Sequence, residues 1–141
     1  MLKHIPKILS PDLMKILLEM GHSDEIVIAD GNFPASTCGK RLIRCDGHGV
    51  PEVLSAILEF FPLDTYSEHS VCLMQVVAGD KIKPVIWQEY KDIVEKMEPT
   101  GLEFEFVERF EFYERAKNAY AVIATSEAAL YANIILKKGV V

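Results

Sequence analysis

A chain of 141 residues can bury a substantial core, and its composition, half hydrophobic and 26% charged, is that of a globular domain rather than a disordered chain. The formal net charge is −6 and no cluster of Lys and Arg occurs, which argues against nucleic acid as a partner because phosphate contacts need clustered cations. No apolar run approaches the roughly 20 residues of a membrane span, and no secretory signal is recognisable, so we expect no membrane partner.

The three cysteines point to a reducing compartment. Cys38, Cys45 and Cys72 are odd in number and have no CxxC spacing, which favours free thiols over a disulfide framework or a zinc site. We therefore expect a cytoplasmic protein.

The first third of the chain predicts a helix, a strand and a loop. Ser10 is a side-chain cap followed by proline, and apolar residues then recur at helical spacing until Gly21 ends the helix. A buried strand is expected over 25–29, and the Gly, Pro, Ser and Asn content of 31–40 predicts an irregular loop. A short strand over 41–45 follows.

The remaining two thirds continue this alternation of helices and strands. The apolar patterns predict helices over 50–61, 84–97 and 109–117, a turn of helix within 125–131, and strands over 71–77, 102–106, 120–124 and 134–136. This alternation without a linker or repeat predicts a single α/β domain over residues 1–141, a three-layer αβα sandwich around a mixed sheet.

Two polar residues bracket the first predicted strand. His22 precedes it, and Asp30 follows it, where open α/β sheets bind their ligands. His22 is either a proton donor near the carbonyl end of the preceding helix or a surface residue that covers those carbonyls. Asp30 either caps a turn with Gly31-Asn32 or accepts hydrogen bonds from ligand hydroxyls. About five strand residues at ~3.3 Å each separate the pair, so they share a small ligand only across the sheet or between subunits.

Three further stretches carry candidate functional groups. Asp64 stands between a helix stop and a strand, where a loop aspartate is the simpler interpretation. The segment 109–115 reads as an amphipathic helix with a Glu111–Arg115 pair at i,i+4 spacing. Tyr131 and Asn133 share a side of an extended segment and together offer the donors and acceptors that sugar hydroxyls need, although a plain strand entry fits equally.

Common cofactor and nucleophile motifs are missing from the sequence. It contains no GxxxxGK[ST] or GxGxxG phosphate loop and no GxSxG elbow. His22-x-Asp24 and Asp46-x-His48 are too sparse for a metal site, which usually takes three or four ligands. Catalysis that needs no cofactor remains open.

Seven stretches spread along nearly the whole chain form one ordered pattern: Leu9-Ser10-Pro11, Met20-Gly21-His22-x-Asp24-Glu25-Ile26, Ala29-Asp30-x-Asn32-Phe33-Pro34-Ala35, Ile43-Arg44-x-Asp46-Gly47, Pro62-Leu63-Asp64-Thr65-Tyr66, Glu108-Arg109-Phe110-Glu111-Phe112-Tyr113-Glu114-Arg115-Ala116 and Tyr131-x-Asn133-Ile134-Ile135-Leu136-Lys137-Lys138-Gly139. In their joint order and spacing, these stretches resemble the fucose mutarotase and ribose pyranase family. The stretch from Arg109 to Ala116 favours the fucose branch, since ribose pyranases typically carry a histidine where Arg109 stands.

The resemblance implies an isomerase that interconverts the anomers of L-fucose without a metal or other cofactor. It also implies a ring-shaped homo-oligomer, often a decamer, with sites near subunit contacts. The alternatives are a D-ribose pyranase and a non-catalytic sugar-binding ring. The family's proton donor matches His22, its other acid/base residues resemble Asp64 and Tyr113, and its sugar-binding positions map to Asp30, Met74, Arg109, Tyr113, Tyr131 and Asn133.

Two positions depart from the family pattern. Ala132 replaces a glycine between Tyr131 and Asn133, and Cys45 replaces an alanine before Asp46. The added methyl of Ala132 would either tighten the sugar pocket or matter little if the backbone there is extended.

Overall fold

In the computed structural model, which describes residues 1–99 and 101–141, six strands form one sheet in the order β2-β5-β1-β6-β3-β4. No helix among these residues is long and apolar enough to cross a membrane. The strands are β1 (Glu25–Ala29), β2 (Leu42–Cys45), β3 (Val71–Met74), β4 (Glu105–Val107), β5 (Ala121–Thr125) and β6 (Ile134–Lys137).

Strand direction distinguishes the two edges of the sheet at which the strands begin and end. β1 is parallel to β5, β5 to β2 and β3 to β4, whereas β6 is antiparallel to both β1 and β3. Five strands therefore point the same way and β6 points back. The start of β6 lies beside the carboxyl ends of β1 and β3, and the end of β6 lies beside their amino ends.

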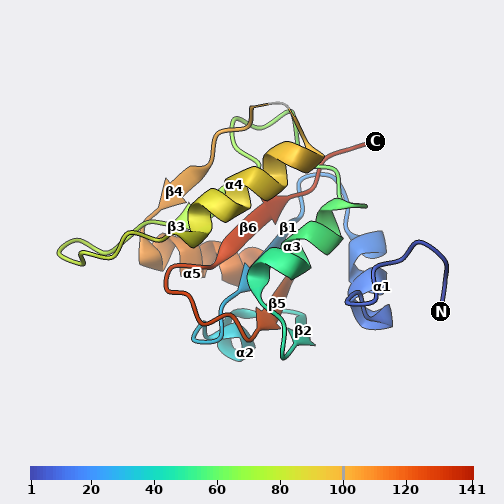
Figure 1. Cartoon of the computed structure of the whole chain (residues 1–141), viewed down its shortest axis with the longest axis horizontal. Coiled ribbons are helices and arrows are strands. Elements are labelled where there is room, and N and C mark those ends of the chain that lie inside the picture. The colour runs from blue at the N-terminus through green and yellow to red at the C-terminus, as the bar shows by residue number, and fades with distance from the viewer. Residues whose placement is uncertain (100) are drawn as a thin grey trace.

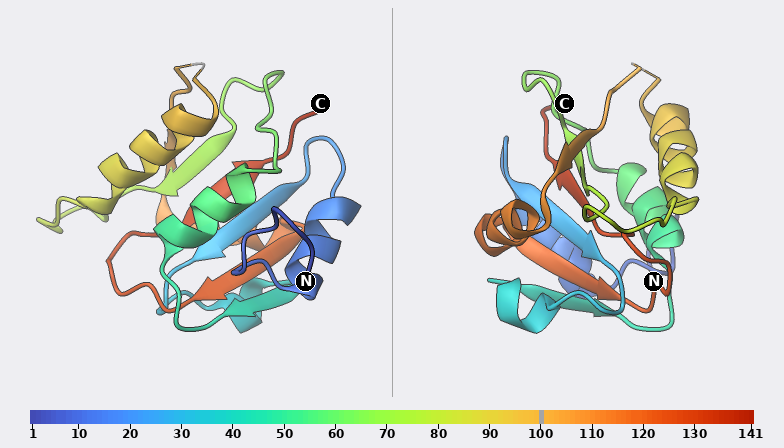
Figure 2. Two further views of the ribbon diagram at one scale, coloured as in Figure 1. Left: turned by 45° about the vertical axis from the view of Figure 1, so that its right-hand side comes forward. Right: turned by 90° about the vertical axis from the view of Figure 1, so that its left-hand side faces the viewer.

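Helices cover both faces of the sheet, which confirms the predicted three-layer sandwich with a mixed sheet (Figures 1 and 2). One face carries α1 (Pro11–Glu19), α3 (Val50–Leu58) and α4 (Ile86–Met97), and the other carries α2 (Ala35–Cys38) and α5 (Arg109–Asn118).

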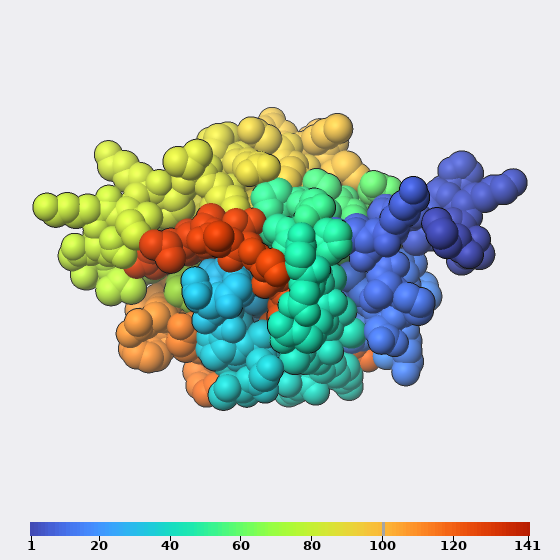
Figure 3. Space-filling view, turned by 60° about the horizontal axis from the view of Figure 1, so that its bottom comes forward, coloured from blue at the N-terminus to red at the C-terminus, as the bar shows by residue number. Residues whose placement is uncertain are grey.

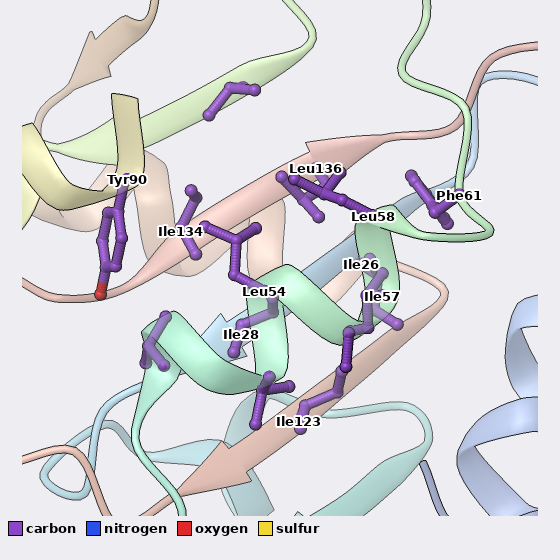
Figure 4. Packing of buried hydrophobic residues seen from close by; sticks show 14 of the residues in the cluster. Ile26, Ile28, Leu54, Ile57, Leu58, Phe61, Tyr90, Ile123, Ile134 and Leu136 are labelled. Atoms are coloured by element: carbon purple, nitrogen blue, oxygen red, sulfur yellow. The ribbon is translucent and has the colours of Figure 1, made fainter. Parts of the chain in front are cut away.

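The strand pleat divides the core into two clusters because successive side chains point to opposite faces. Ile26 and Ile28 of β1 face α1 and α3, whereas Val27 and Ala29 face α2 and α5. In the first cluster the helix α3 lies over the centre of the sheet (Figure 4). Both faces of β1 are buried, so the residues at its two ends are held in fixed positions.

Polar caps set where the helices begin. The Ser10 hydroxyl accepts a hydrogen bond from the Leu13 amide at 3.1 Å, as its place before Pro11 predicts. The Glu108 carboxylate caps α5 by accepting from the Phe110 amide at 2.8 Å. This cap places Arg109 at the first position of α5, directly after β4.

The structure corrects several predicted elements, and β4 begins at Glu105 instead of 102. β3 ends at Met74 instead of 77, because its partner β4 ends at Val107, where the α5 cap begins. The predicted loop 31–40 contains the one-turn helix α2, and α3 ends at Leu58 instead of 61. The segment 126–133 forms turns instead of the expected helical turn, since the Glu127 carboxylate binds the Val50 amide at the start of α3.

Candidate functional site

A pocket of about 240 Å³ opens at the edge of the sheet where the carboxyl ends of β1, β3 and β4 meet the start of β6. In the space-filling view, the cyan residues after β1 lie beside the red segment before β6 (Figure 3). The volume lies just below the ~300–1,000 Å³ usual for small-molecule pockets. Asp30, Asn32, Phe33, Met74, Val77, Asp80, Arg109, Tyr113, Leu130, Tyr131 and Asn133 line the pocket.

Asp30 and Asn133 tie the strand ends together at the base of the pocket. The Asp30 amide donates to the Asn133 side-chain oxygen at 2.7 Å, and the Asn32 amide donates to an Asp30 carboxylate oxygen at 2.9 Å. The turn-capping interpretation of Asp30 is therefore confirmed, and the residue also lines the pocket. Burial raises the pKa of the Asp30 carboxyl, against the opposing effect of its hydrogen bonds. A buried carboxylate of this kind is a strong acceptor for a ligand hydroxyl.

Tyr131 fixes the loop after β3 against the pocket. Its hydroxyl donates to the Asp80 carboxylate at 2.6 Å and accepts from the Val77 amide at 3.4 Å, and its carbonyl accepts from the Trp87 indole at 2.8 Å. The hydrogen bond to Asp80 raises the pKa of the Tyr131 phenol and lowers that of Asp80. Tyr131 has a left-handed backbone with φ of 56°, so Tyr131 and Asn133 do not lie on a plain extended strand as predicted, yet both line the pocket.

The first turn of α5 supplies a cation and a phenol to the pocket. Arg109 and Tyr113 are four residues apart and therefore lie on one side of the helix. The Arg109 guanidinium lies 4.7 Å from the centre of the Phe110 ring, and the Tyr113 ring packs edge-on against Phe33 with ring centres 5.4 Å apart. These ring contacts hold both side chains at the wall of the pocket.

His22 and Asp64 lie at the opposite edge of the sheet, outside the pocket. His22 Nε2 is 3.0 Å from Asp64 Oδ1, and the His22 side chain is 42% exposed whereas that of Asp64 is 0% exposed. The hydrogen-bond partner of the His22 ring is thus Asp64, and not the helix carbonyls that the sequence suggested. Asp64 is no ordinary loop aspartate, because a charged side chain is rarely buried unless it is paired.

The Asp64 carboxylate is held as an ion by several donors. The Tyr66 amide donates to Oδ1 at 3.1 Å, and the Ser67 amide and hydroxyl donate to Oδ2 at 3.2 and 2.5 Å. The Ser67 hydroxyl, opposed by burial and aided by His22, holds the pKa of the Asp64 carboxyl well below its usual range.

Backbone pairing with the end of β6 places Asp64 beside His22. The Asp64 amide donates to the Lys137 carbonyl at 3.0 Å, and the Ser23 amide donates to the Lys138 carbonyl at 2.8 Å. Gly139 permits this approach, since a Cβ there would lie 2.5 Å from the Leu63 carbonyl oxygen.

The structure thus divides the eight candidate residues into two groups. Asp30, Met74, Arg109, Tyr113, Tyr131 and Asn133 line one pocket, and His22 and Asp64 form a pair at the other edge. Sequence reasoning missed Asn32, Phe33, Val77, Asp80 and Leu130 in the pocket and Ser67 beside Asp64. The sequence predicted only a turn at Gly79-Asp80, and no pattern in it indicated a role for Ser67.

Two smaller expectations are also decided by the structure. Arg115 pairs with Glu25 at 2.9 Å and with Glu105 at 2.8 Å, so the predicted Glu111–Arg115 pair is wrong. Ala132 is fully buried in the cluster under α3 and α4, Cys45 is also buried, and neither lines the pocket. The extra methyl therefore does not narrow the pocket.

Among residues 1–99 and 101–141, no group of three or more His, Cys, Asp or Glu side chains is placed to hold a metal ion. The pocket instead combines carboxylate, amide, guanidinium and phenol groups with apolar surface from Met74 and Phe33. Such a mixture suits a small ligand with several hydroxyls.

Residues 3–141 match the model of the RbsD / FucU transport protein family. The chain belongs to this family. Within the RbsD / FucU family, the fucose mutarotase of Danio rerio is 50% identical over 146 residues, covering 99% of this chain and 94% of that protein.

Solved structures show the same relationship. The Streptococcus pneumoniae fucose mutarotase in complex with L-fucose superposes with a TM-score of 0.93 at 54% identity, covering 99% of both chains. Bacillus subtilis RbsD complexed with D-ribose gives a TM-score of 0.74 at 29% identity, covering 100% of this chain and 99% of that one. The chain is thus more similar to the fucose-bound member than to the ribose-bound one.

Proposed function

We propose that this chain is an L-fucose mutarotase, an isomerase that interconverts the α and β anomers of L-fucopyranose. The observation that carries the proposal is the convergence of six residues, named from the sequence as sugar-binding positions, on one small polar pocket. Fucose mutarotases that are 45% to 54% identical over nearly the whole chain support the same activity and the same sugar.

The pocket suits a pyranose in shape and chemistry. Asp30 offers a carboxylate and Asn133 an amide at its base, Arg109 offers planar donors, and Tyr113 and Tyr131 offer phenols, which together match a ring of hydroxyls. Met74 provides apolar surface for the carbon face of the sugar.

Anomer exchange in this proposal needs only proton transfers. An acid gives a proton to the ring oxygen while a base takes the proton of the anomeric hydroxyl, and the C1–O bond to the ring oxygen breaks to leave the open-chain aldehyde. Rotation about C1–C2 and closure on the other carbonyl face, with both transfers reversed, returns each group to its starting state. Positioned acid–base groups typically contribute 10²–10⁴-fold each.

We assign His22 as the acid and Tyr113 as its counterpart in the pocket. Asp64 is buried and its two oxygens already accept from His22, Tyr66 and Ser67, which favours an orienting role over direct contact with the sugar. Tyr113 lines the pocket, and no residue within 1–99 and 101–141 hydrogen-bonds its hydroxyl, which supports its assignment to the anomeric position.

The same assignment requires a second subunit. His22 and the pocket lie at opposite ends of β1, about 16 Å apart along the strand, so His22 of one copy would complete the pocket of another. We propose a ring-shaped homo-oligomer, a decamer by the family resemblance, whose active sites lie between subunits. Three free buried cysteines support a cytoplasmic location.

Saturation-transfer NMR between the anomers of L-fucose and of D-ribose tests the activity. We expect exchange of fucose anomers well above the buffer rate, and slower exchange or none for ribose. Binding of fucose without exchange would favour a non-catalytic sugar-binding ring, and pyranose–furanose exchange of ribose alone would favour a pyranase.

A further inference from the structure

A chain of hydrogen bonds leads from the end of β6 to the His22 ring. Lys137 Nζ donates to Ser67 Oγ at 3.3 Å, the Ser67 hydroxyl donates to Asp64 Oδ2 at 2.5 Å, and Asp64 Oδ1 meets His22 Nε2 at 3.0 Å. Lys137 is only 24% exposed and lies 3.9 Å from Glu25, which Arg115 holds in turn. This series of hydrogen bonds is therefore held by partly buried ion pairs of the fold.

The ammonium group of Lys137 determines which group donates and which accepts along this series of hydrogen bonds. An ammonium group donates and cannot accept, so Ser67 Oγ accepts from Lys137 and turns its single proton toward Asp64. The Asp64 carboxylate is then an acceptor only, and His22 Nε2 must carry a proton toward it. Nδ1 is left as the ring nitrogen that gains and loses a proton.

We propose that Ser67, oriented by Lys137, is a positioning residue for the His22–Asp64 pair, and that His22 exchanges its catalytic proton through Nδ1. The inference rests on the proposed function for its catalytic consequence, but the arrangement of protons holds without it. Ser67 does not line the pocket and is not a member of the His22–Asp64 pair, so it acts on His22 only through Asp64.

Removing the Ser67 hydroxyl changes the pair in two ways. Asp64 loses the shorter of the two hydrogen bonds to Oδ2 and keeps the one from the Ser67 amide, so the His22 ring is held less firmly. The Lys137 ammonium also loses its Ser67 partner and no longer connects the end of β6 to the pair.

The kinetic test compares Ser67→Ala with Ser67→Thr, which keeps the hydroxyl, and with Ser70→Ala as a matched control. Ser70 is a buried serine three residues away whose hydroxyl has no hydrogen-bond partner within the described part of the chain. We expect S67A to lower the maximal rate of fucose anomer exchange about tenfold with KM within twofold, while S67T and S70A keep the wild-type rate.

The second test needs no sugar. Solid-state ¹⁵N spectra of sedimented, [¹⁵N]histidine-labelled protein report the tautomers of the four histidine rings, and His22→Ala assigns the His22 signals. We expect neutral His22 to carry its proton on Nε2 in the wild type. The Nε2-protonated share of neutral His22 should fall in S67A and return in S67T. Lys137→Met, which frees the Ser67 hydroxyl to turn, should lower this share in the same way and serves if S67A does not assemble.

Neutral His22 with its proton on Nδ1 would overturn the proposal, as would S67A and K137M variants that match S70A in both rate and His22 tautomer. If the wild-type protein showed the expected tautomer but did not exchange the anomers of fucose, the result would contradict the proposed function alone and leave the proton arrangement standing.

Discussion

Mixed oligomers test the proposal that each active site draws His22 from one subunit and the pocket from another. Two variants carry one substitution each, His22→Ala at one edge of the sheet and Asp30→Asn at the other. Each variant alone should be nearly inactive, because H22A lacks the acid and D30N replaces the carboxylate at the base of the pocket with a neutral amide. When the two chains are refolded together in equal amounts, some sites combine an intact His22 with an intact pocket.

The expected recovery follows from the separation of the two groups. If a site takes its histidine and its pocket from different chains that mix at random, half of the donors and half of the acceptors are intact, so about one quarter of the wild-type activity returns. If both groups came from one chain, every site would keep one lesion and no activity would return. The structure favours the first outcome because the buried, hydrogen-bonded strand β1 separates the two groups within a chain.

The assay is saturation-transfer NMR of fucose anomers, with native mass spectrometry to show that subunits have mixed. Two control mixtures carry lesions on the same side: H22A with Asp64→Asn, and D30N with Arg109→Ala. Neither should recover. A cross-side mixture that has mixed yet recovers nothing, or same-side mixtures that recover equally, would refute the shared site.

Two further predictions concern stability. Asp64→Asn should lower the free energy of unfolding by about 2 kcal/mol at pH 7, since it removes a buried ion from its donors. Folding lowers the pKa of Asp64, so the stability that its carboxylate contributes is present above the unfolded pKa near 4 and is progressively lost as the pH falls below it. Urea unfolding at fixed protein concentration should therefore show a smaller difference in unfolding free energy between D64N and wild type at pH 3 than at pH 7. A constant gap would contradict this account. Ala132→Gly should cost about 1.5 kcal/mol by the same assay, through a lost core methyl and added chain entropy, with KM for fucose unchanged. A changed KM would show that the methyl does affect the pocket.

The layers of the fold were predictable because local signals agree with burial. The cap at Ser10 and the alternation of buried helices and strands gave every major element within a few residues. The errors fall where distant partners decide the outcome. β3 ends at Met74 because its partner strand β4 ends beside it, and the Glu127 carboxylate binds the start of α3 where a helical turn was expected.

The pocket residues were named mainly through the family resemblance, and physics alone left most of them undecided. A turn aspartate such as Asp30 has the same local sequence whether or not it faces a ligand. The His22–Asp64 bond joins residues 42 positions apart, and no periodicity connects them. The partners of Arg115 were wrong for the same reason, because Glu25 is brought to it by the sheet and Glu111 is only its neighbour in the chain.

The reversed strand β6 explains why one chain holds both halves of the chemistry without joining them. Its start brings Asn133 to the pocket, and its end brings Lys137 to the Ser67–Asp64 pair. Ladder bonds to β1 and β3 fix both ends, so a loop movement that brought His22 to its own pocket would have to break the centre of the sheet. A second copy needs no such rearrangement: the half-exposed His22 ring already faces outward on a rigid support. The fold therefore favours assembly, and not closure of a lid within one chain, as the step that completes the site.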